Sequence, residues 1–385
     1  MAPITFPVYI LFFVIFCILV FFLVKTPSHS LKNPFPYSFL STEYIPTVVS
    51  EKDKKTITWI IHMYPPVHNA GAEWMAHCIN KYLIDKAGFK VNVIVPSFPI
   101  KSFEGVNIIT FNETEKVERA ITHSCILVSH LDYSRHAVLT AAQAKRPIAL
   151  VMHNHQQEPL LEWVSSRISS QNIHLINNSS WIKQLYGHLH YNSIVVYPPV
   201  YWKEYQTSPT SHHKYVTLIN LNSNKGGNVL IQLAQRMPDV QFLGVEGSYD
   251  NQIKNTSVKN IRYIKNTPNI KEVYSITQIL IVPSREESWG RVAVEAMSSG
   301  IPIIANPTPG LKEACGSAGL YANYDNISEW VSIIRELQSN TLFYKKKSSE
   351  CFARAQELDP TYQLSKLSLW LQEIEWNKSS TELIL

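Results

Sequence analysis

Cysteine, concentrated positive charge and internal repeats are scarce in this 385-residue sequence. The five cysteines are Cys17, Cys78, Cys125, Cys315 and Cys351, and no two of them have the C-x-x-C spacing of a metal or redox site. This scatter favours reduced thiols in a cytosolic compartment and excludes a disulfide framework. No dense Lys/Arg run of the nucleic-acid-binding kind occurs, so nucleic acid is not an expected partner. The net charge of +5 suits phosphate-bearing ligands or an anionic membrane surface.

The longest apolar run covers residues 8–24 and contains no charged residue. Its length approaches the roughly 20 residues that span a bilayer. No positive charge precedes it and no small-residue cleavage site follows it, which predicts an uncleaved single-pass membrane anchor at residues 1–25 and a linker at 26–55. Lys25 and Lys32 follow the run, so the positive-inside rule predicts that the bulk of the chain lies in the cytosol. The alternative is the lumen of the secretory pathway, where the six glycosylation sequons of the chain would be usable.

Apolar and helical segments alternate along the rest of the chain. This alternation predicts an α/β protein with two Rossmann-like domains, at residues 56–205 and 206–360. The first domain opens with a strand expected at Ile57–Ile61, and the second with a strand expected at Tyr215–Leu221. Residues 361–385 contain a further helix with one apolar face and a tail.

One stretch of the second domain predicts a strand, a polar turn, a helix and a second strand. The first strand is expected at Ile279–Val282 and the helix over Trp289–Ser299, with Gly300 as its stop. Ligands of parallel sheets bind beyond the carboxyl ends of the strands. Gly290 permits a close approach of a ligand to the backbone. The first free amides of the helix and the charge of Arg291 predict an anion site suited to phosphate.

Two glutamates accompany this turn. Glu287 lies in the loop, and Glu295 lies eight positions on (295 − 287 = 8), inside the helix. At ~1.5 Å rise per residue, Glu295 is roughly 7 Å below the phosphate position. This depth matches the reach from a nucleotide phosphate to its ribose hydroxyls, for which a carboxylate is a good acceptor. Solvated surface glutamates on an ordinary αβ unit are the alternative.

The run PSREESWGRVAVEAMSSGIPII resembles the donor-binding motif of GT-B glycosyltransferases, specifically the retaining family four (glycosyl transferases group 1). Ser288 replaces the family's usual glycine and Trp289 its usual phenylalanine. The resemblance implies two Rossmann-like doubly wound domains facing a central cleft, with the helix in 361–385 crossing back to the first domain. It also implies sugar transfer from a nucleotide diphosphate sugar, with retention of configuration, to a glycan, lipid-linked or protein acceptor.

Other positions extend the resemblance. Lys225 and Gly226 match the family's pyrophosphate-binding K-G, whereas Asn220 stands five positions earlier, where relatives usually have arginine. Gly71 lies in a loop that resembles the family's glycine-rich loop with one glycine fewer. His153 best matches the histidine that faces the donor sugar; a hydrogen-bonded loop histidine is the alternative.

The resemblance thus implies a set of site residues. The implied catalytic residues are His153, Glu287 and Lys225. The implied donor-binding residues are Gly71, Asn220, Lys225, Gly226, Ser288, Trp289, Gly290, Arg291 and Glu295.

The sequence contains no Asp-x-Asp pair, which argues against the metal-dependent GT-A class. We therefore expect catalysis without a metal or other cofactor. A metal site formed by His153, His155 and Glu158 is a weaker alternative, because no further ligand is evident from the spacing. An alternative function is that of a catalytically silent GT-B scaffold. It is motivated by Asn220 and by the loop at Gly71, which has one glycine fewer than the family's loop. A GT-B sugar-nucleotide epimerase or phosphorylase is another.

Overall fold

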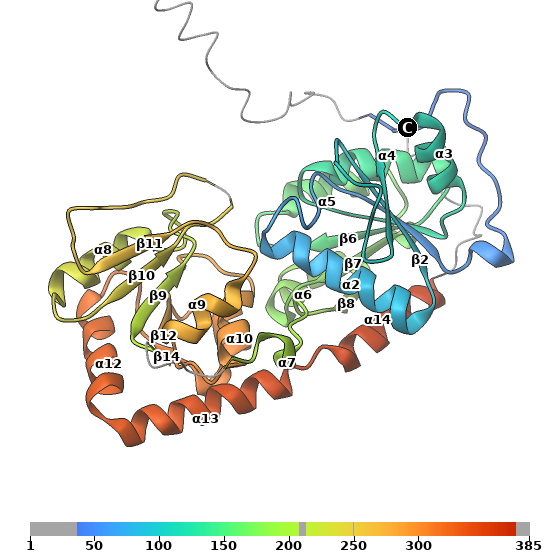
Figure 1. Cartoon of the computed structure of the whole chain (residues 1–385). Coiled ribbons are helices and arrows are strands. Elements are labelled where there is room, and N and C mark those ends of the chain that lie inside the picture. The colour runs from blue at the N-terminus through green and yellow to red at the C-terminus, as the bar shows by residue number, and fades with distance from the viewer. Residues whose placement is uncertain (1–36, 208–212, 249, 375–385) are drawn as a thin grey trace, which may run out of the picture. The chain divides into compact units, whose positions relative to one another are not determined.

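A computed structural model describes residues 37–207, 213–248 and 250–374 of the protein. These residues form two sheets with helices on their faces, and all strands are parallel except one short antiparallel pair (Figure 1). The predicted α/β architecture with two Rossmann-like domains is confirmed. The anchor expected at residues 1–25 lies outside the described ranges. Within those ranges, no helix is both long enough and apolar enough to cross a membrane.

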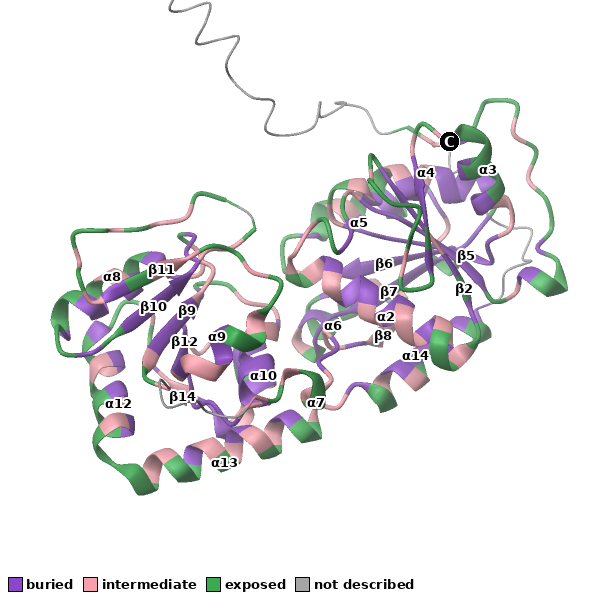
Figure 2. Ribbon diagram, in the orientation of Figure 1, coloured by how far each residue is buried: buried purple, intermediate pink, exposed green. Residues whose placement is uncertain are grey.

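The first sheet has the strand order β3-β4-β2-β1-β5-β6-β7-β8. Its strands are β1 (Thr56–Ile60), β2 (Lys90–Val95), β3 (Ser102–Phe103), β4 (Val106–Thr110), β5 (Ile126–His130), β6 (Ile148–Met152), β7 (Ile173–Asn177) and β8 (Asn192–Val195). The α-helices of this part are α2 (Gly71–Ala87), α3 (Thr114–Thr122), α4 (Ser134–Ala144), α5 (Glu158–Ser165), α6 (Ser180–Tyr186) and α7 (Trp202–Tyr205). Short 3-10 turns occur at η1 (Glu51–Asp53), η2 (Leu131–Tyr133), η3 (Ser170–Asn172) and η4 (Gly187–Leu189). Strands β1, β5 and β6 are buried along their whole length, as expected for parallel strands covered on both faces (Figure 2).

The second sheet has the strand order β11-β10-β9-β12-β13-β14. Its strands are β9 (Tyr215–Ile219), β10 (Phe242–Val245), β11 (Ile261–Ile264), β12 (Thr277–Val282), β13 (Ile303–Ala305) and β14 (Leu320–Tyr321). Its helices are α8 (Gly227–Arg236), α9 (Ile270–Ile276), α10 (Arg291–Met297), α11 (Pro309–Cys315), the 3-10 turn η5 (Gly316–Ala318), α12 (Ile327–Ser339) and α13 (Thr341–Glu357). Because β9 and β12 are parallel neighbours, the loops that follow them emerge at the same edge of the sheet.

The observed boundaries differ from the expected ones where the backbone turns left-handed. The first strand of the second domain ends at Ile219, earlier than expected, because Asn220 has a φ of 69°. The helix expected over Trp289–Ser299 starts at residue 291, because Gly290 has a φ of 100°. A positive φ cannot continue a strand or a right-handed helix, so both elements are cut at these residues.

The last helix, α14 (Thr361–Glu373), packs on the first domain. Leu364, Leu367 and Leu371 are buried in the same core cluster as Ile79 and Leu83 of α2. Helices α12 and α13 instead pack against helices of the second domain. The chain therefore passes between the two domains twice, near α7 and again between α13 and α14 (Figure 1).

Candidate functional site

The loops after β9 and β12 bring two predicted catalytic residues together. The Lys225 ammonium donates a hydrogen bond to the Glu287 carboxylate, although the two residues are 62 positions apart. The loops are also joined through their backbones, because Arg285 N donates to Asn224 O at 2.8 Å. The Lys225 backbone N–H donates to Asn222 Oδ1 at 2.8 Å, which fixes the lysine at the tip of its loop. The site thus contains a partly exposed ion pair at the carboxyl edge of the second sheet.

Glycine is required at two turns of this edge. Gly226 has a φ of 92°, and a Cβ there would lie 2.5 Å from Cγ of Pro283 at the end of β12. Gly290 combines its positive φ with a tight contact, because a Cβ would lie 2.5 Å from Cδ2 of Leu311. The fold itself therefore requires glycine at both positions, whether or not a ligand approaches the backbone there.

Asn220 stabilises the turn that follows β9. Its left-handed conformation is one that asparagine tolerates well. Its Oδ1 accepts hydrogen bonds from Asn222 N at 3.2 Å and from Gln252 Nε2 at 3.3 Å. Asn220 is thus a neutral side chain that holds two loops in place.

The guanidinium of Arg291, whose charge contributed to the predicted anion site, has three partners within the protein. Its Nε donates to Glu295 Oε1 at 2.7 Å, its Nη1 to Pro199 O at 2.9 Å and its Nη2 to the Tyr205 hydroxyl at 2.7 Å. The side chains of Arg291 and Glu295 are each 9% exposed. In the structure, Arg291 neutralises Glu295 and ties α10 to the segment that leads out of the first domain, and its role in donor binding stays a prediction.

Glu295 has a second partner inside the protein. Its Oε2 accepts a hydrogen bond from the Tyr274 hydroxyl at 2.8 Å. Burial, and then the Glu295 carboxylate, raise the pKa of Tyr274 well above its ordinary value, so this hydroxyl keeps its proton and remains a donor. The carboxylate predicted to bind ribose is therefore already held by two side chains.

Ser288 and Trp289 face the first domain. The Trp289 ring is buried and stacks on Tyr197, with ring centroids 3.9 Å apart and an interplanar angle of 9°. Ser288 Oγ accepts from Asn178 Nδ2 at 2.7 Å, and Ser288 O accepts from Trp181 Nε1 at 2.9 Å. The side chains of Ser288 and Trp289 thus fasten the Glu287 loop to the first domain.

The first domain contributes Gly71 and its loop. Gly71 is the first residue of α2, and a Cβ there would meet no atom within 4 Å, so the fold itself does not require glycine at this position. Asn69 Nδ2 donates to Asn266 Oδ1 at 2.9 Å and to Thr267 O at 3.0 Å. The loop therefore contacts the segment that follows β11 in the second domain.

His153 follows β6 directly and is held by its backbone. Its N–H donates to Gln157 Oε1 at 2.9 Å, and its carbonyl accepts from Asn178 Nδ2 at 3.2 Å. Since the Asn178 amide also binds Ser288, it joins His153 to the Glu287 loop. Burial lowers the pKa of His153 to about 4, so the imidazole is neutral at pH 7.

Sequence reasoning missed two residues that organise this site. Asn178 begins an Asn-Ser-Ser run that leads into α6, a composition typical of a helix start. His130 ends strand β5, and its Nδ1 lies 2.9 Å from His153 Nε2. A signal for His130 was present, because apolar strands of the first sheet are repeatedly followed by histidine at their carboxyl ends.

The metal site considered as an alternative does not assemble. His155 lies 3.9 Å from Glu286, and Glu158 lies 3.7 Å from His188, so neither turns to His153. In residues 37–374, apart from the segments left undescribed, no group of three His, Cys, Asp or Glu side chains is placed to hold a metal ion. Cys78, Cys125, Cys315 and Cys351 are free thiols, and Cys17 lies outside the described residues.

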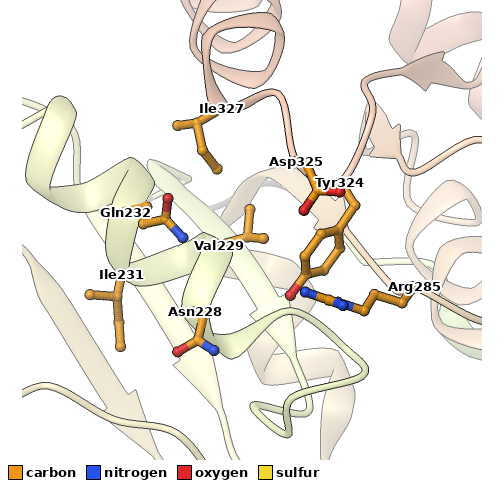
Figure 3. A pocket seen from close by; sticks show the side chains of 8 residues that line it. All are labelled: Asn228, Val229, Ile231, Gln232, Arg285, Tyr324, Asp325 and Ile327. Carbon is orange, nitrogen blue, oxygen red and sulfur yellow. The ribbon is translucent and has the colours of Figure 1, made fainter.

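A polar cavity of about 300 Å³ adjoins the Glu287 loop. It lies between α8 and the start of α12, and Arg285 and Tyr324 project into it from one side (Figure 3). The Arg285 guanidinium lies 4.2 Å from the centroid of the Tyr324 ring. Arg285 thus forms a cation–π contact with Tyr324 at this cavity.

Two parallel αβ domains of this kind have the architecture of the GT-B fold. Residues 201–357 match the family model described as glycosyl transferases group 1. This match and the fold of the solved structures confirm the resemblance to GT-B glycosyltransferases that the sequence predicted.

Known proteins agree with this assignment. The D-inositol 3-phosphate glycosyltransferase of Corynebacterium aurimucosum is 30% identical over 147 residues, which cover 33% of this chain and 35% of that protein. The match thus spans about a third of this relative's length. An uncharacterized glycosyltransferase of Methanocaldococcus jannaschii is 27% identical over 272 residues, covering 65% of this chain and 76% of that protein. The structure of Anabaena HepE in complex with UDP-glucose superposes with a TM-score of 0.67 at 18% identity, covering 82% of this chain and 98% of that one, which supports the fold.

Proposed function

We propose that the protein transfers a sugar from a nucleotide diphosphate sugar to a glycan, lipid-linked or protein acceptor, with retention of configuration and without a metal. The observation that carries this proposal is the Lys225–Glu287 pair at the joined ends of β9 and β12. A compact ammonium suits a diphosphate, and a neighbouring carboxylate suits the hydroxyls of the attached sugar. The Anabaena structure holds UDP-glucose, so a UDP-sugar is the first donor to test.

The proposed mechanism assigns one task to each residue. Negative charge develops on the departing diphosphate, and Lys225 is placed to stabilise it there. In doing so, Lys225 exchanges its bond to Glu287 for one to the phosphate, which frees the carboxylate for sugar hydroxyls. His153, neutral at pH 7, offers a hydrogen bond without adding charge. Glu287 orients the sugar and forms no covalent bond to it.

Metal removal tests the mechanism. Purified full chain incubated with UDP-, GDP- and ADP-sugars and candidate acceptors should transfer a sugar from one of these donors, and the rate should persist in excess EDTA. The reason is that Lys225, in place of a divalent cation, balances the diphosphate. Complete loss of activity that Mg²⁺ restores would contradict metal-independent transfer.

A nucleotide-binding scaffold without transferase activity is the second candidate. Two observations favour it: Asn220 supplies no charge to the diphosphate, and Glu295 is already engaged by Arg291. Calorimetric binding of a nucleotide sugar without hydrolysis or transfer in the same donor panel would support the scaffold. Interconversion of the sugar or its release by inorganic phosphate would instead indicate an epimerase or a phosphorylase.

We further propose that residues 8–24 anchor the protein in a membrane, with its two domains in the cytosol. The support is the uncharged apolar run and the lysines that follow it. Protease added to sealed microsomes should digest the bulk of the chain. Full protection before detergent, or glycans on Asn112 or Asn255, would place the domains in the lumen.

A further inference from the structure

Three adjacent strands of the first sheet lead to histidines at one edge. His130 is the last residue of β5, His153 follows β6, and His62 lies two positions after β1. The strand order β1-β5-β6 makes these ends neighbours. His62 Nε2 lies 3.3 Å from Oε1 of Glu73, a fully buried residue of α2. The sequence comparison with the family concerns His153 and gives no role to His130.

His130 is enclosed between aromatic rings. It is 1% exposed, its ring lies edge-on to Trp59 at 6.1 Å between centroids, and the His62 ring is 5.9 Å away. Its Nδ1 lies 2.9 Å from His153 Nε2. Burial, and then the neighbouring His153, hold the pKa of His130 well below its ordinary value, so both imidazoles are neutral at pH 7. A neutral imidazole has one N–H and one lone pair, so one of the two facing nitrogens donates and the other accepts.

The surroundings of His130 decide which nitrogen donates. Its second ring nitrogen, Nε2, is buried and has no hydrogen-bond partner among the described residues. A proton on this nitrogen would be an orphaned buried N–H, which is rarer in proteins than an under-satisfied acceptor. The proton therefore belongs on Nδ1, which donates to His153 Nε2. His153 accepts at Nε2 and carries its own proton on Nδ1.

We propose that His130 is the positioning residue that fixes the tautomer and the ring orientation of His153. Gln157 and Asn178 already hold the backbone of His153, so only the rotation of its imidazole ring remains to be fixed. The bond from His130 removes this freedom and presents the Nδ1–H of His153 to the ligand as a donor. A sugar oxygen that accepts a hydrogen bond is the matching group. This inference rests on the proposed function, because it takes His153 to face the donor sugar.

Two variants separate positioning from mere packing. His130→Phe keeps a ring in the enclosure and removes the hydrogen bond. His130→Asn places an amide N–H near the original Nδ1 and should rescue the interaction. His174→Asn is the matched control, because His174 is a buried histidine of the same sheet, with a pKa lowered to about 4 by burial, and bonds to Asn192 instead.

Nitrogen NMR of the full chain with labelled histidine reads the tautomer directly, with the His153 signals assigned by loss in His153→Gln. We expect a protonated Nδ1 and a bare Nε2 on His153 in the wild type, in His130→Asn and in His174→Asn. His130→Phe should show mixed tautomers and a kcat lowered about tenfold to a hundredfold, by analogy with the loss when the hydrogen-bond partner of a metal-bound histidine is removed. Its nucleotide affinity should stay unchanged.

The outcomes separate this proposal from the proposed function. A wild-type His153 that carries its proton on Nε2 would overturn the positioning role, as would a folded His130→Phe with an unaltered His153 tautomer and kcat. Failure of the wild type to transfer any sugar would overturn the proposed function, while the NMR spectra would still decide the tautomer. If His130→Phe does not fold, the wild-type spectrum together with His130→Asn decides the question.

Discussion

We expect Glu295→Ala to lower the free energy of unfolding by about 3–5 kcal/mol, because it leaves a buried guanidinium without its counter-ion. Arg291 would keep the Pro199 carbonyl and the Tyr205 hydroxyl, which are neutral partners. Tyr274 would also lose its acceptor. Urea unfolding followed by circular dichroism measures the loss.

A double variant tests the cause. Arg291→Met together with Glu295→Leu removes both charges and should recover most of the stability, since replacing a buried pair by apolar side chains is often neutral. The exposed pair between Arg354 and Glu357 offers a control, in which Glu357→Ala should cost no more than about 1 kcal/mol. Equal losses in Glu295→Ala and Glu357→Ala would show that the pair on α10 is not held in a desolvated environment.

This expected instability changes how the ribose assignment is tested. Glu295→Gln is the better variant, because an amide oxygen can still accept from Tyr274. Loss of a hydrogen bond from ribose to a charged group costs roughly 1.5–3 kcal/mol, or about tenfold to a hundredfold in affinity. If folded Glu295→Gln binds nucleotide as tightly as the wild type, Glu295 serves Arg291 and not the ribose.

Lys225→Ala should lower kcat about 10²- to 10³-fold, the usual loss when one preorganised donor to a developing negative charge is removed. The effect should be large because the other side chains that could stabilise negative charge on the diphosphate are neutral or form contacts elsewhere. Asn220 is neutral, Arg291 is paired with Glu295, and Arg285 stacks on Tyr324. Nucleotide affinity should fall as well, since the diphosphate is already charged in the ground state.

Two further variants make this result specific. Lys254→Ala removes an ammonium that pairs with Glu246 in another loop of the second domain and should leave kcat unchanged. Glu287→Gln should lower kcat but leave nucleotide affinity intact, because its proposed partner is the sugar. Transfer rates at saturating donor and calorimetric affinities distinguish the cases. A Lys225→Ala protein with wild-type kcat would remove Lys225 from the mechanism.

The sequence predicted those parts of the site that depend on local patterns. Apolar runs marked the strands, and glycine marked the turn at Gly290. These inferences need only the chemistry of short segments. The contact of Lys225 with Glu287 was not predicted, because it depends on β9 and β12 being neighbours in the sheet.

The sequence could not predict partners that come from distant segments. The pairing of Arg291 with Glu295, four positions on in the same helix, has a local signal in the sequence. Its bonds to Tyr205 and Pro199, which lie 86 and 92 positions away, have none. The bond between Ser288 and Asn178, 110 positions away, has none either. These bonds depend on packing between domains.

The return of α14 to the first domain has a consequence for biosynthesis. Domains usually fold in order as the ribosome releases them. Here, residues 56–205 emerge long before Leu364, Leu367 and Leu371, which complete the cluster around Ile79 and Leu83. The apolar face of α2 therefore stays exposed to solvent until almost the whole chain has been synthesised. A message truncated before residue 361 would yield a protein in which this apolar face stays open to chaperones and proteases.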